Sequence, residues 1–316
     1  MKRDLRIIFM GTPAFAVATL SKLLEHNYNV VGVITAPDKP AGRGQKLQQS
    51  EVKKFALQNG LTVLQPKNLK AEDFLHILKT LRPNLQIVVA FRMLPKAVWE
   101  LPEYGTFNLH ASLLPQYRGA APINWAIING ETKTGVTTFF IDEHIDTGEI
   151  IMSEETPIAP DETAGSLHDK LMHLGSRLVI KTVAQIEKGP VHTKTQPKID
   201  HPKTAYKLTR DNCKLDFNAS VHTLYNKIRG LSPYPAAWCT LLNNNEQLDI
   251  KIYSAQKIIL KHNHPPGYLL IEKNSIKVAT KEGLLELLEI QLPGKRKMDT
   301  KSLLNGYTFY PEAKLR

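Results

Sequence analysis

The chain has 316 residues, enough for about two domains, and its 42 % hydrophobic and 22 % charged residues are close to the averages of globular proteins. This composition argues against a disordered, collagenous or coiled-coil protein, and two cysteines, Cys213 and Cys239, are too few for a disulfide framework or a thiolate metal cage. The net charge of +11 favours a polyanionic partner or substrate.

The first part of the chain alternates between strand and helix signals. Apolar runs typical of buried strands occur at residues 5–10, 30–34, 85–91, 106–109 and 136–141, and helical patterns occur after Thr12 and at 73–81, 123–128 and 166–186. This alternation predicts an α/β domain over residues 1–189, with a Rossmann-like, mostly parallel sheet that has helices on both faces. In such sheets the active site lies beyond the carboxyl ends of the strands.

A polar, proline-containing stretch follows. Residues 190–208 show no sustained hydrophobic period, so we expect a linker there. Five short β-rich segments come next, at residues 237–242, 248–253, 267–271, 275–279 and 285–289. They predict a smaller, five-stranded OB-like β-barrel domain over residues 209–316. Residues 198–316 carry 19 − 11 = +8 of the net charge, against 22 − 19 = +3 for residues 1–197, so the second domain is the better candidate for binding RNA.

The sequence contains no sign of a membrane or secreted protein. No apolar run approaches the ~18 residues that a bilayer span requires, and the first residues lead directly into a strand-like stretch. Two isolated cysteines suit a reducing compartment. We therefore expect a cytoplasmic protein without a signal peptide.

The glycine turn after the first predicted strand does not fit a dinucleotide site. The run from Gly11 to Ala16 lacks the second glycine that lets the backbone approach a pyrophosphate, and Pro13 removes an amide donor. NAD binding is therefore not expected.

Polar side chains follow two of the later strands. Strand alternation places Asn108 and His110 on one face, and Asp146 lies in the polar loop after the fifth predicted strand. An amide can donate to a developing oxyanion, an imidazole can relay a proton and a carboxylate can orient the imidazole, so this trio suits acyl transfer. Ser112 lacks the glycines of a nucleophile elbow, which implies that the nucleophile belongs to the substrate. On chemistry alone, a histidine beside a strand is more often a packed or surface residue, and that alternative stays open.

Five motifs that follow one another in the first part of the chain resemble the folate-dependent formyltransferases, and together with the basic second domain the match spans nearly the whole chain. The central motif is the run Asn108-x-His110-x-Ser112-Leu113-Leu114-Pro115-x-Tyr117-Arg118-Gly119, with Asp146-Thr147-Gly148 downstream. The others are Phe9 to Pro13, Pro37 to Gly44 and Gly119 to Ile123. These three motifs and the basic second domain are similar to the branch of the family that formylates initiator methionyl-tRNA. The resemblance implies transfer of a formyl group from 10-formyltetrahydrofolate to the free amino group of methionine on initiator tRNA, for translation initiation.

The resemblance also implies roles for particular residues. It makes Asn108, His110 and Asp146 the catalytic trio. It places a second group at the folate: Ser112, Leu113, Leu114, Pro115 and Phe91. It places the loop that carries Lys39, Arg43 and Lys46 at the acceptor end of the tRNA, for which the alternative is a solvated turn. One departure from the family pattern is the segment from Phe91 to Pro95, which is one residue shorter and has Arg92 in the place of a glycine.

These expectations leave two rival functions open. One is a folate-dependent formyltransferase for a nucleotide sugar or a purine precursor, although the Gly11 turn is a poor phosphate cradle. The other is a non-catalytic OB-fold RNA-binding protein. No metal is expected, because His262 and His264 have no third or fourth ligand near them in the sequence. A monomer is expected.

Overall fold

The structure is a computed structural model that describes residues 2–41 and 46–316, and these residues form two compact units. The first unit contains the described residues up to Gly119 together with Thr134–Thr156 and His168–Thr204. The second unit contains Ala120–Lys133, Pro157–Leu167 and Ala205–Arg316. Two short segments within the first 189 residues therefore fold with the second unit.

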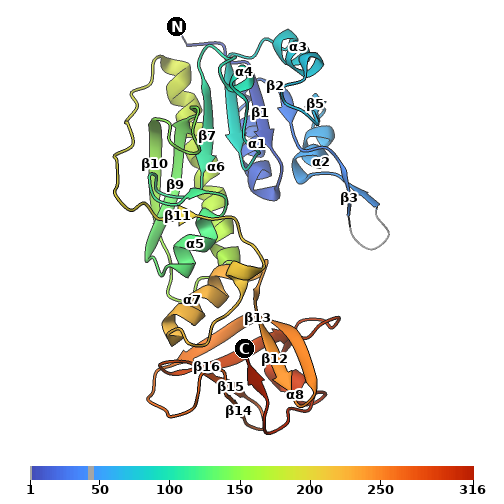
Figure 1. The fold of residues 1–316 in the computed structure, drawn as a ribbon. Helices are drawn as coiled ribbons and strands as arrows, with labels where there is room; N and C mark the ends of the chain where they lie inside the picture. Colours follow the sequence, from blue (N-terminus) through green and yellow to red (C-terminus); the bar gives the residue numbers. More distant parts are fainter. Residues whose placement is uncertain (1, 42–45) are drawn as a thin grey trace. The chain divides into compact units, whose positions relative to one another are not determined.

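A seven-stranded sheet forms the centre of the first unit in the described part of the chain (Figure 1). Its spatial order is β10 (Ile150–Pro157), β9 (Lys133–Phe140), β7 (Thr106–His110), β6 (Leu85–Val89), β1 (Ile7–Gly11), β2 (Val30–Ile34) and β5 (Val63–Leu64). The strands from β7 to β5 pair in parallel, whereas β9 pairs antiparallel with β7. All five residues of β1 are buried, as in a strand covered on both faces. The expected mostly parallel α/β sheet is confirmed.

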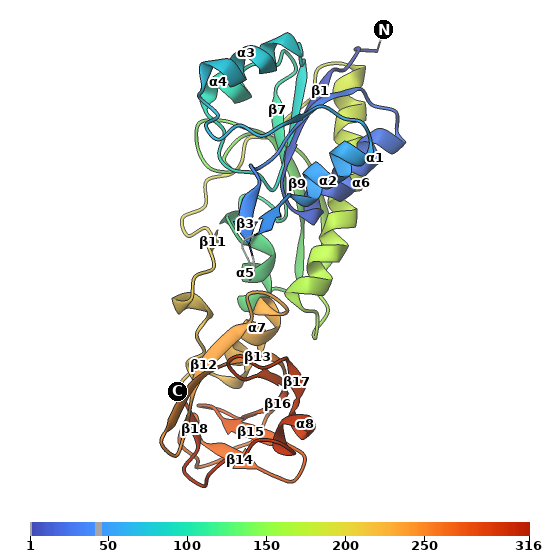
Figure 2. The same ribbon diagram turned by 90° about the vertical axis from the view of Figure 1, so that its right-hand side faces the viewer.

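Helices cover both faces of this sheet. Figure 2 shows α1 (Ala14–Glu25) and α6 (Ala164–Lys188) on one side, and α3 (Glu72–Thr80) and α4 (Lys96–Trp99) on the other. The remaining elements of this part are α2 (Glu51–Gln58), the hairpin of β3 (Lys39–Ala41) and β4 (Lys46–Gln48), and the short strands β8 (Arg118–Gly119) and β11 (Thr204–Ala205).

The packing of α6 on the sheet decides which side chains of β7 are free for chemistry. A Cβ atom on Gly175 of α6 would lie only 2.7 Å from Leu109, so the helix lies directly against this residue of β7. Because side chains alternate along a strand, Asn108 and His110 belong to the opposite face of the sheet. That face also carries α3, since Ile8 of β1 and Phe74 of α3 share one apolar core.

The second unit is built on an antiparallel barrel. The strands follow one another in the order β14 (Leu269–Ile271), β15 (Ile276–Ala279), β16 (Leu284–Gln291), β13 (Glu246–Ile258), β12 (Ala237–Asn243) and β18 (Lys314–Leu315), and β17 (Met298–Asp299) pairs with β16. A bridge between Tyr268 and Lys314 joins the two ends of this order, so the six-stranded barrel is nearly closed. The expected barrel is confirmed. It has one strand more than the five expected, because β18 is too short to leave a sequence pattern.

Helices α5 (Pro122–Ile128), α7 (Val221–Leu231) and α8 (Thr300–Leu304) and a 3₁₀ turn at Asp211–Cys213 complete this unit. The Ser220 side chain caps α7 by accepting a hydrogen bond from the Thr223 amide. Leu224 and Ile228 of α7 are buried in the barrel core. Across the described ranges, no helix is both long and apolar enough to span a membrane.

Candidate active site

Two polar side chains of the sequence motif lie at the carboxyl end of β7. His110 is the last residue of the strand and is 6 % exposed, whereas Asn108 is half-buried. Within the described residues, the Asn108 side chain has no hydrogen-bond partner. The amide is therefore free to bind a ligand.

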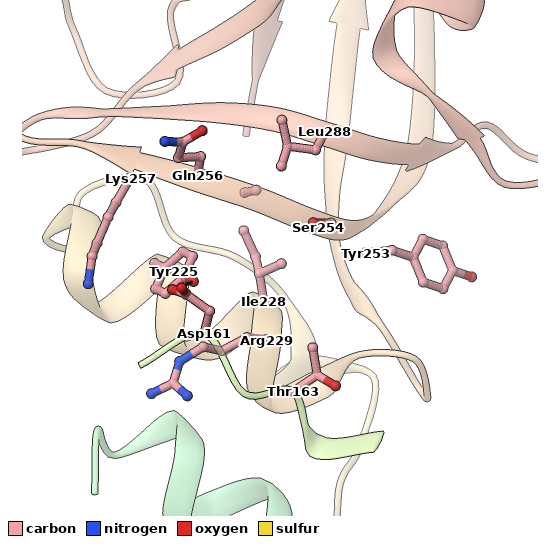
Figure 3. Close-up of a pocket in the computed structure, with 11 residues that line it drawn as sticks. Asp161, Thr163, Tyr225, Ile228, Arg229, Tyr253, Ser254, Gln256, Lys257 and Leu288 are labelled. Atoms are coloured by element: carbon pink, nitrogen blue, oxygen red, sulfur yellow. Dashed lines mark hydrogen bonds between the residues drawn. The ribbon is translucent and has the colours of Figure 1, made fainter. Parts of the chain in front are cut away.

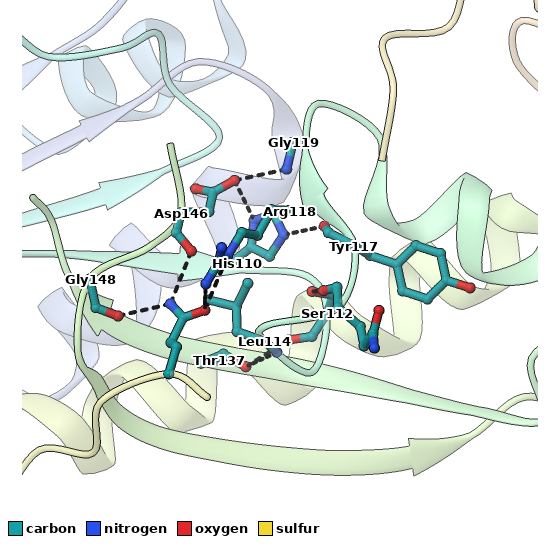
Figure 4. Close-up of polar contacts among 11 residues, drawn as sticks. His110, Ser112, Leu114, Tyr117, Arg118, Gly119, Thr137, Asp146 and Gly148 are labelled. Carbon is teal, nitrogen blue, oxygen red and sulfur yellow. Dashed lines mark hydrogen bonds and ion pairs between the residues drawn. The ribbon is translucent and has the colours of Figure 1, made fainter. Parts of the chain in front are cut away.

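His110 is held between a carbonyl and a carboxylate, as Figure 4 shows. Its Nε2 atom lies 2.8 Å from the carbonyl oxygen of Tyr117, and its Nδ1 atom lies 3.8 Å from Oδ2 of Asp146. A carbonyl oxygen only accepts hydrogen bonds, so Nε2 carries a hydrogen and donates it. Nδ1 is then the nitrogen that can gain a proton, and the Asp146 carboxylate would stabilise the resulting charge.

Asp146 reaches His110 by an indirect route. Because β9 is antiparallel to β7, the loop that follows β9 begins beside Thr106, where the Ile141 amide donates to the Thr106 carbonyl over 2.8 Å. Thr106 is the first residue of β7 and His110 is the last, so the loop has to run back along the sheet to bring Asp146 to His110.

Several local contacts fix the shape of this loop. Asp146 has a left-handed φ of 56°, and its Oδ2 accepts a hydrogen bond of 2.9 Å from the Gly119 amide. The Asp142 carboxylate accepts from the Thr147 hydroxyl over 2.7 Å. A Cβ on Gly148 would lie 1.7 Å from the carbonyl oxygen of Phe140, so only glycine fits at this position. These contacts give a structural reason for the sequence Asp146-Thr147-Gly148 in this loop.

The predicted folate segment forms a tight turn directly after His110. Ser112 is fully buried, and its hydroxyl donates to the Gln116 carbonyl over 2.7 Å. The Thr137 hydroxyl donates to the Ser112 carbonyl over 2.7 Å and accepts from the Leu114 amide over 3.3 Å. Leu113 lies against β9, because a Cβ on Gly135 would be 2.6 Å from its Cδ2 atom. The Leu114–Pro115 peptide bond is cis. The Ser112 side chain is thus used inside the turn.

Phe91 and Arg92 lie in the loop between β6 and α4. Phe91 is half-buried against the apolar core on the α3 side of the sheet. The Arg92 guanidinium donates to the carbonyls of Pro66 and Lys67, the latter over 2.9 Å. The arginine that replaces the family glycine is therefore bonded to a neighbouring loop.

The three basic residues predicted to bind tRNA lie in or beside the hairpin of β3 and β4. Lys39 begins β3 and is exposed, Lys46 begins β4, and Arg43 lies outside the described residues. Asp38 precedes this hairpin, and its carboxylate accepts from Lys53 Nζ over 2.6 Å and from Gln65 Nε2 over 2.8 Å. The bond from Lys53, and then that from Gln65, lowers the pKa of Asp38. These bonds anchor the base of the hairpin to α2 and to the segment after β5.

Sequence reasoning missed Gln196, which contacts the Asp146 loop. Its amide nitrogen lies 2.9 Å from the Asp146 carbonyl and 2.8 Å from the Gly148 carbonyl. Gln196 lies in the polar, proline-containing stretch expected to be a linker, where no periodicity or motif distinguishes it.

The second unit contains a separate cavity of about 410 Å³ between α7 and β13 (Figure 3). The Tyr225 hydroxyl donates to Asp161 over 2.6 Å, and the Arg229 guanidinium donates to the Glu162 carbonyl and to Asn226, each over 2.9 Å. Burial, followed by the bond to Asp161, raises the pKa of Tyr225 to about 12. None of the predicted site residues lines this cavity. Over residues 2–41 and 46–316, no cluster of three His, Cys, Asp or Glu is placed to hold a metal ion.

Comparison with known proteins gives a consistent result for both parts of the chain. Residues 5–183 match the family described as formyl transferase, and residues 207–308 match the formyl transferase C-terminal domain. The chain is 62 % identical over 311 residues to methionyl-tRNA formyltransferase of Flavobacterium johnsoniae, covering 98 % of this chain and 99 % of the relative. It is 52 % identical over 311 residues to methionyl-tRNA formyltransferase of Bacteroides fragilis, covering 97 % and 96 %.

Two solved structures share the fold. WlaRD, a sugar 3N-formyl transferase in the presence of dTDP and 5-N-formyl-THF, has a TM-score of 0.64 at 23 % identity, covering 93 % of this chain and 100 % of its own. HypX from Aquifex aeolicus in complex with tetrahydrofolic acid has a TM-score of 0.64 at 16 % identity, covering 96 % of this chain and 47 % of its own. At these identities the likeness concerns the fold alone.

Proposed function

The chain belongs to the methionyl-tRNA formyltransferases of the formyl transferase family, and from this we propose that it transfers a formyl group from 10-formyltetrahydrofolate to the amino group of methionine on initiator tRNA. The observation that carries this proposal is the pairing of His110 with Asp146 at the end of β7, in a chain 62 % identical to such an enzyme over 98 % of its length.

The reaction begins with direct attack by the substrate amine. A free α-amino group has a pKa of about 7.7–8.0, and esterification of the carboxyl lowers it, so much of the amine is neutral at physiological pH. Its lone pair forms a bond to the formyl carbon, and negative charge develops on the formyl oxygen. The bond from the formyl carbon to N10 of the folate then breaks, the amine loses a proton and N10 gains one. The product is N-formylmethionyl-tRNA.

Three side chains assist these steps. Asn108 donates its amide hydrogen to the developing oxyanion, a role supported by the absence of any other partner for this amide among the described residues. Donation from His110 to the same oxygen would require Nε2 to leave the Tyr117 carbonyl, so His110 acts here by carrying, at Nδ1, the proton that leaves the amine. Asp146, at 3.8 Å, stabilises the charge that the imidazole gains.

The donor binds beside this trio, against Leu113, Leu114, Pro115 and Phe91. The segment from Leu113 to Pro115 directly follows β7, which brings the formyl group of a folate bound there near His110. Ser112 contributes by holding the turn, since its hydroxyl is already bonded to the Gln116 carbonyl. The folate is a co-substrate here, and no step requires a metal.

The acceptor tRNA binds through cations. Lys39, Arg43 and Lys46 contact its acceptor end, and the barrel domain, with most of the net charge of the chain, contacts its phosphates. We place the boundaries of the catalytic domain at residues 1–189, of the linker at 190–208 and of the tRNA-binding domain at 209–316. We propose that the enzyme acts as a monomer, and its substrates place it in the cytoplasm.

A formylation assay with competing acceptors tests this function. The purified protein is incubated with 10-formyltetrahydrofolate and an equimolar mixture of initiator methionyl-tRNA, a dTDP-amino sugar and glycinamide ribonucleotide. We expect formyl transfer to methionyl-tRNA alone, detected as N-formylmethionine after deacylation. Formylation of either small acceptor in preference to the tRNA, or no transfer to any of them, would contradict the proposal.

A further inference from the structure

Gln196 is a buried side chain that connects the two loops of the proposed active site. Its exposure is 7 %, and it lies in the stretch after α6 (Ala164–Lys188) that the sequence marks only as polar and rich in proline. The backbone of this stretch pairs with the start of β10, where Lys194 and Ile150 exchange two hydrogen bonds of 2.8 Å each. This pairing places Gln196 beside the backbone of the Asp146 loop.

The nitrogen and the oxygen of the Gln196 side-chain amide both bond to residues of the proposed active site. The Nε2 atom donates to the carbonyls of Asp146 and Gly148, over 2.9 and 2.8 Å. The Oε1 atom accepts from the guanidinium of Arg118, over 2.6 and 3.1 Å. Carbonyls only accept and a guanidinium only donates, so the orientation of the amide is fixed by its partners.

Arg118 belongs to the loop that binds the other side of His110. The carbonyl of Tyr117 accepts from His110 Nε2, and the amide of Gly119 donates to Asp146 Oδ2 over 2.9 Å. One glutamine therefore binds the side chain of Arg118, which adjoins the carbonyl that faces the imidazole, and two backbone carbonyls of the loop that carries the carboxylate.

We infer that Gln196 is a positioning residue for formyl transfer: it holds the Asp146 loop against the His110 loop and so sets the distance between the carboxylate and the imidazole. The Asp146 loop needs such support because it runs back along the sheet from the far end of β7 and includes a left-handed residue. This inference rests on the proposed roles of His110 and Asp146. Gln196 itself need not touch either substrate.

Two substitutions of Gln196 distinguish the contribution of its amide oxygen from that of its amide nitrogen. Gln196→Met keeps the volume and removes all four hydrogen bonds, whereas Gln196→Glu keeps an acceptor for Arg118 and removes both donors to the loop carbonyls. Misplacing a catalytic group by about 1 Å can cost roughly 10²-fold in rate. We expect both variants to lower kcat about 10- to 100-fold, with KM for the donor and for methionyl-tRNA changed by less than about threefold. Thr195→Ala is the control, because this neighbouring hydroxyl bonds to no group of the described chain other than the side chain of Glu149, over 3.3 Å.

A further readout distinguishes positioning from general stability. If Gln196 acts through Asp146, adding Gln196→Met to an Asp146→Asn variant should lower kcat less than about threefold further, and Gln196→Met alone should change the pH profile of kcat in the direction in which Asp146→Asn changes it. Thermal unfolding of each variant shows whether a loss of kcat comes from misfolding. If Gln196→Met does not fold, Gln196→Glu, which retains the contact with Arg118, takes its place in these comparisons.

The outcomes are distinct. The inference is overturned if folded Gln196→Met or folded Gln196→Glu keeps the wild-type kcat. It is also overturned if Gln196→Met lowers kcat by the same factor in the Asp146→Asn variant as in the wild-type protein. If Asp146→Asn and His110→Ala themselves turn over normally in the same assay, the proposed function of the trio fails instead. Loss of kcat in both Gln196 variants, with little further loss on Asp146→Asn, supports the inference.

Discussion

The polar cluster around His110 in the first unit and the one around Tyr225 in the second differ in how much hydrogen-bonding capacity they leave unused. In the second unit, Tyr225, Asp161 and Arg229 bond to one another or to neighbouring protein groups beside a cavity of about 410 Å³. In the first unit, the Asn108 amide has no partner among the described residues, and the Nδ1 atom of His110 faces a carboxylate across 3.8 Å. Tyr225 and Arg229 are buried, as His110 is, but Asp161 is exposed; the Tyr225 cluster thus holds its buried groups in pairs, whereas the His110 cluster keeps a half-buried amide without a partner in the described chain.

A cavity and a reactive site therefore need not coincide in this protein. A buried polar group that is fully paired contributes to stability, whereas one held in place with a free donor or acceptor can serve chemistry. The contacts around the Asp146 loop go to its backbone and to Oδ2, the carboxylate oxygen that also faces His110, so they fix the position of this oxygen relative to the imidazole. Each of the following substitutions tests one side of this contrast.

The largest expected effect is on the His110 cluster. His110→Ala should lower kcat by about 10²- to 10⁴-fold, because it removes acid–base assistance, and Asn108→Ala should lower it by about 10²- to 10³-fold, because it removes an oxyanion donor. Unfolding temperatures should change little for Asn108→Ala, which breaks no described side-chain hydrogen bond. Steady-state kinetics and thermal unfolding measure both. Near-normal turnover in a folded variant would show that this cluster is not the reactive one.

Gly148→Ala should have a somewhat smaller effect on the same cluster. The new Cβ would lie 1.7 Å from the Phe140 carbonyl, so the Asp146 loop would have to move away from β9. We expect about a 10²-fold loss of kcat from the displaced carboxylate. Gly306→Ala is the matched control, since a Cβ there meets no atom within 4 Å. Equal kcat for the two alanine variants would show that the loop position does not matter.

The Tyr225 cluster should respond in stability and not in turnover. Tyr225→Phe removes the hydroxyl that bonds to Asp161 and should lower the free energy of unfolding by about 0.5–1.5 kcal/mol near neutral pH, with kcat within about twofold of wild type. The pKa of Tyr225 is raised to about 12 from an ordinary value of 10.0, so its contribution is complete below pH 10 and is lost as the pH rises through 12.

Denaturant titrations at neutral pH and between pH 10 and 12 check this expectation. The difference between wild type and Tyr225→Phe should shrink as the pH rises over that range. A large loss of turnover in a folded Tyr225→Phe variant would instead place this cluster in the catalytic machinery.

The smallest expected effect concerns the basic hairpin. Each of Lys39→Ala and Arg43→Ala should reduce the slope of log Kd for tRNA against log salt by about one unit, as expected for the loss of one phosphate contact. Arg43→Ala should also lower kcat, because its loop is proposed to reach the acceptor end. Binding titrations at several salt concentrations measure the slopes. Unchanged tRNA binding and formylation by Arg43→Ala would reduce the loop to a solvated turn.

The sequence was sufficient to predict the central elements of the fold. The apolar run at 30–34 coincides with β2, and the periodic stretch at 166–186 lies within α6 (Ala164–Lys188), because buried strands and amphipathic helices leave clear patterns. Strand β10 was missed because it buries only Ile151 and carries polar residues, including Glu154 and Glu155, where an apolar run would mark a strand. Two-residue strands such as β18 are set by tertiary pairing and leave no local pattern.

The sequence indicated the chemistry of the site better than its geometry. Alternation placed Asn108 and His110 on one face, and the motif loop supplied Asp146, which lies 3.8 Å from His110. The sequence did not indicate the route by which Asp146 reaches His110, because nothing in it shows that β9 is antiparallel to β7 and that its loop returns along the sheet. The support that Gln196 gives this loop comes from a distant stretch whose pairing with β10 no sequence pattern reveals.

The most direct test of the reactive cluster is a single-turnover cycle of His110→Ala, Asp146→Asn and the double variant, with saturating 10-formyltetrahydrofolate and initiator methionyl-tRNA. If imidazole and carboxylate act as one unit, the rate of N-formylmethionyl-tRNA formation should fall at least about 10²-fold in His110→Ala and hardly further in the double variant. Two losses that multiply independently, or rates near wild type in either single variant, would contradict the assignment of the reaction to this pair.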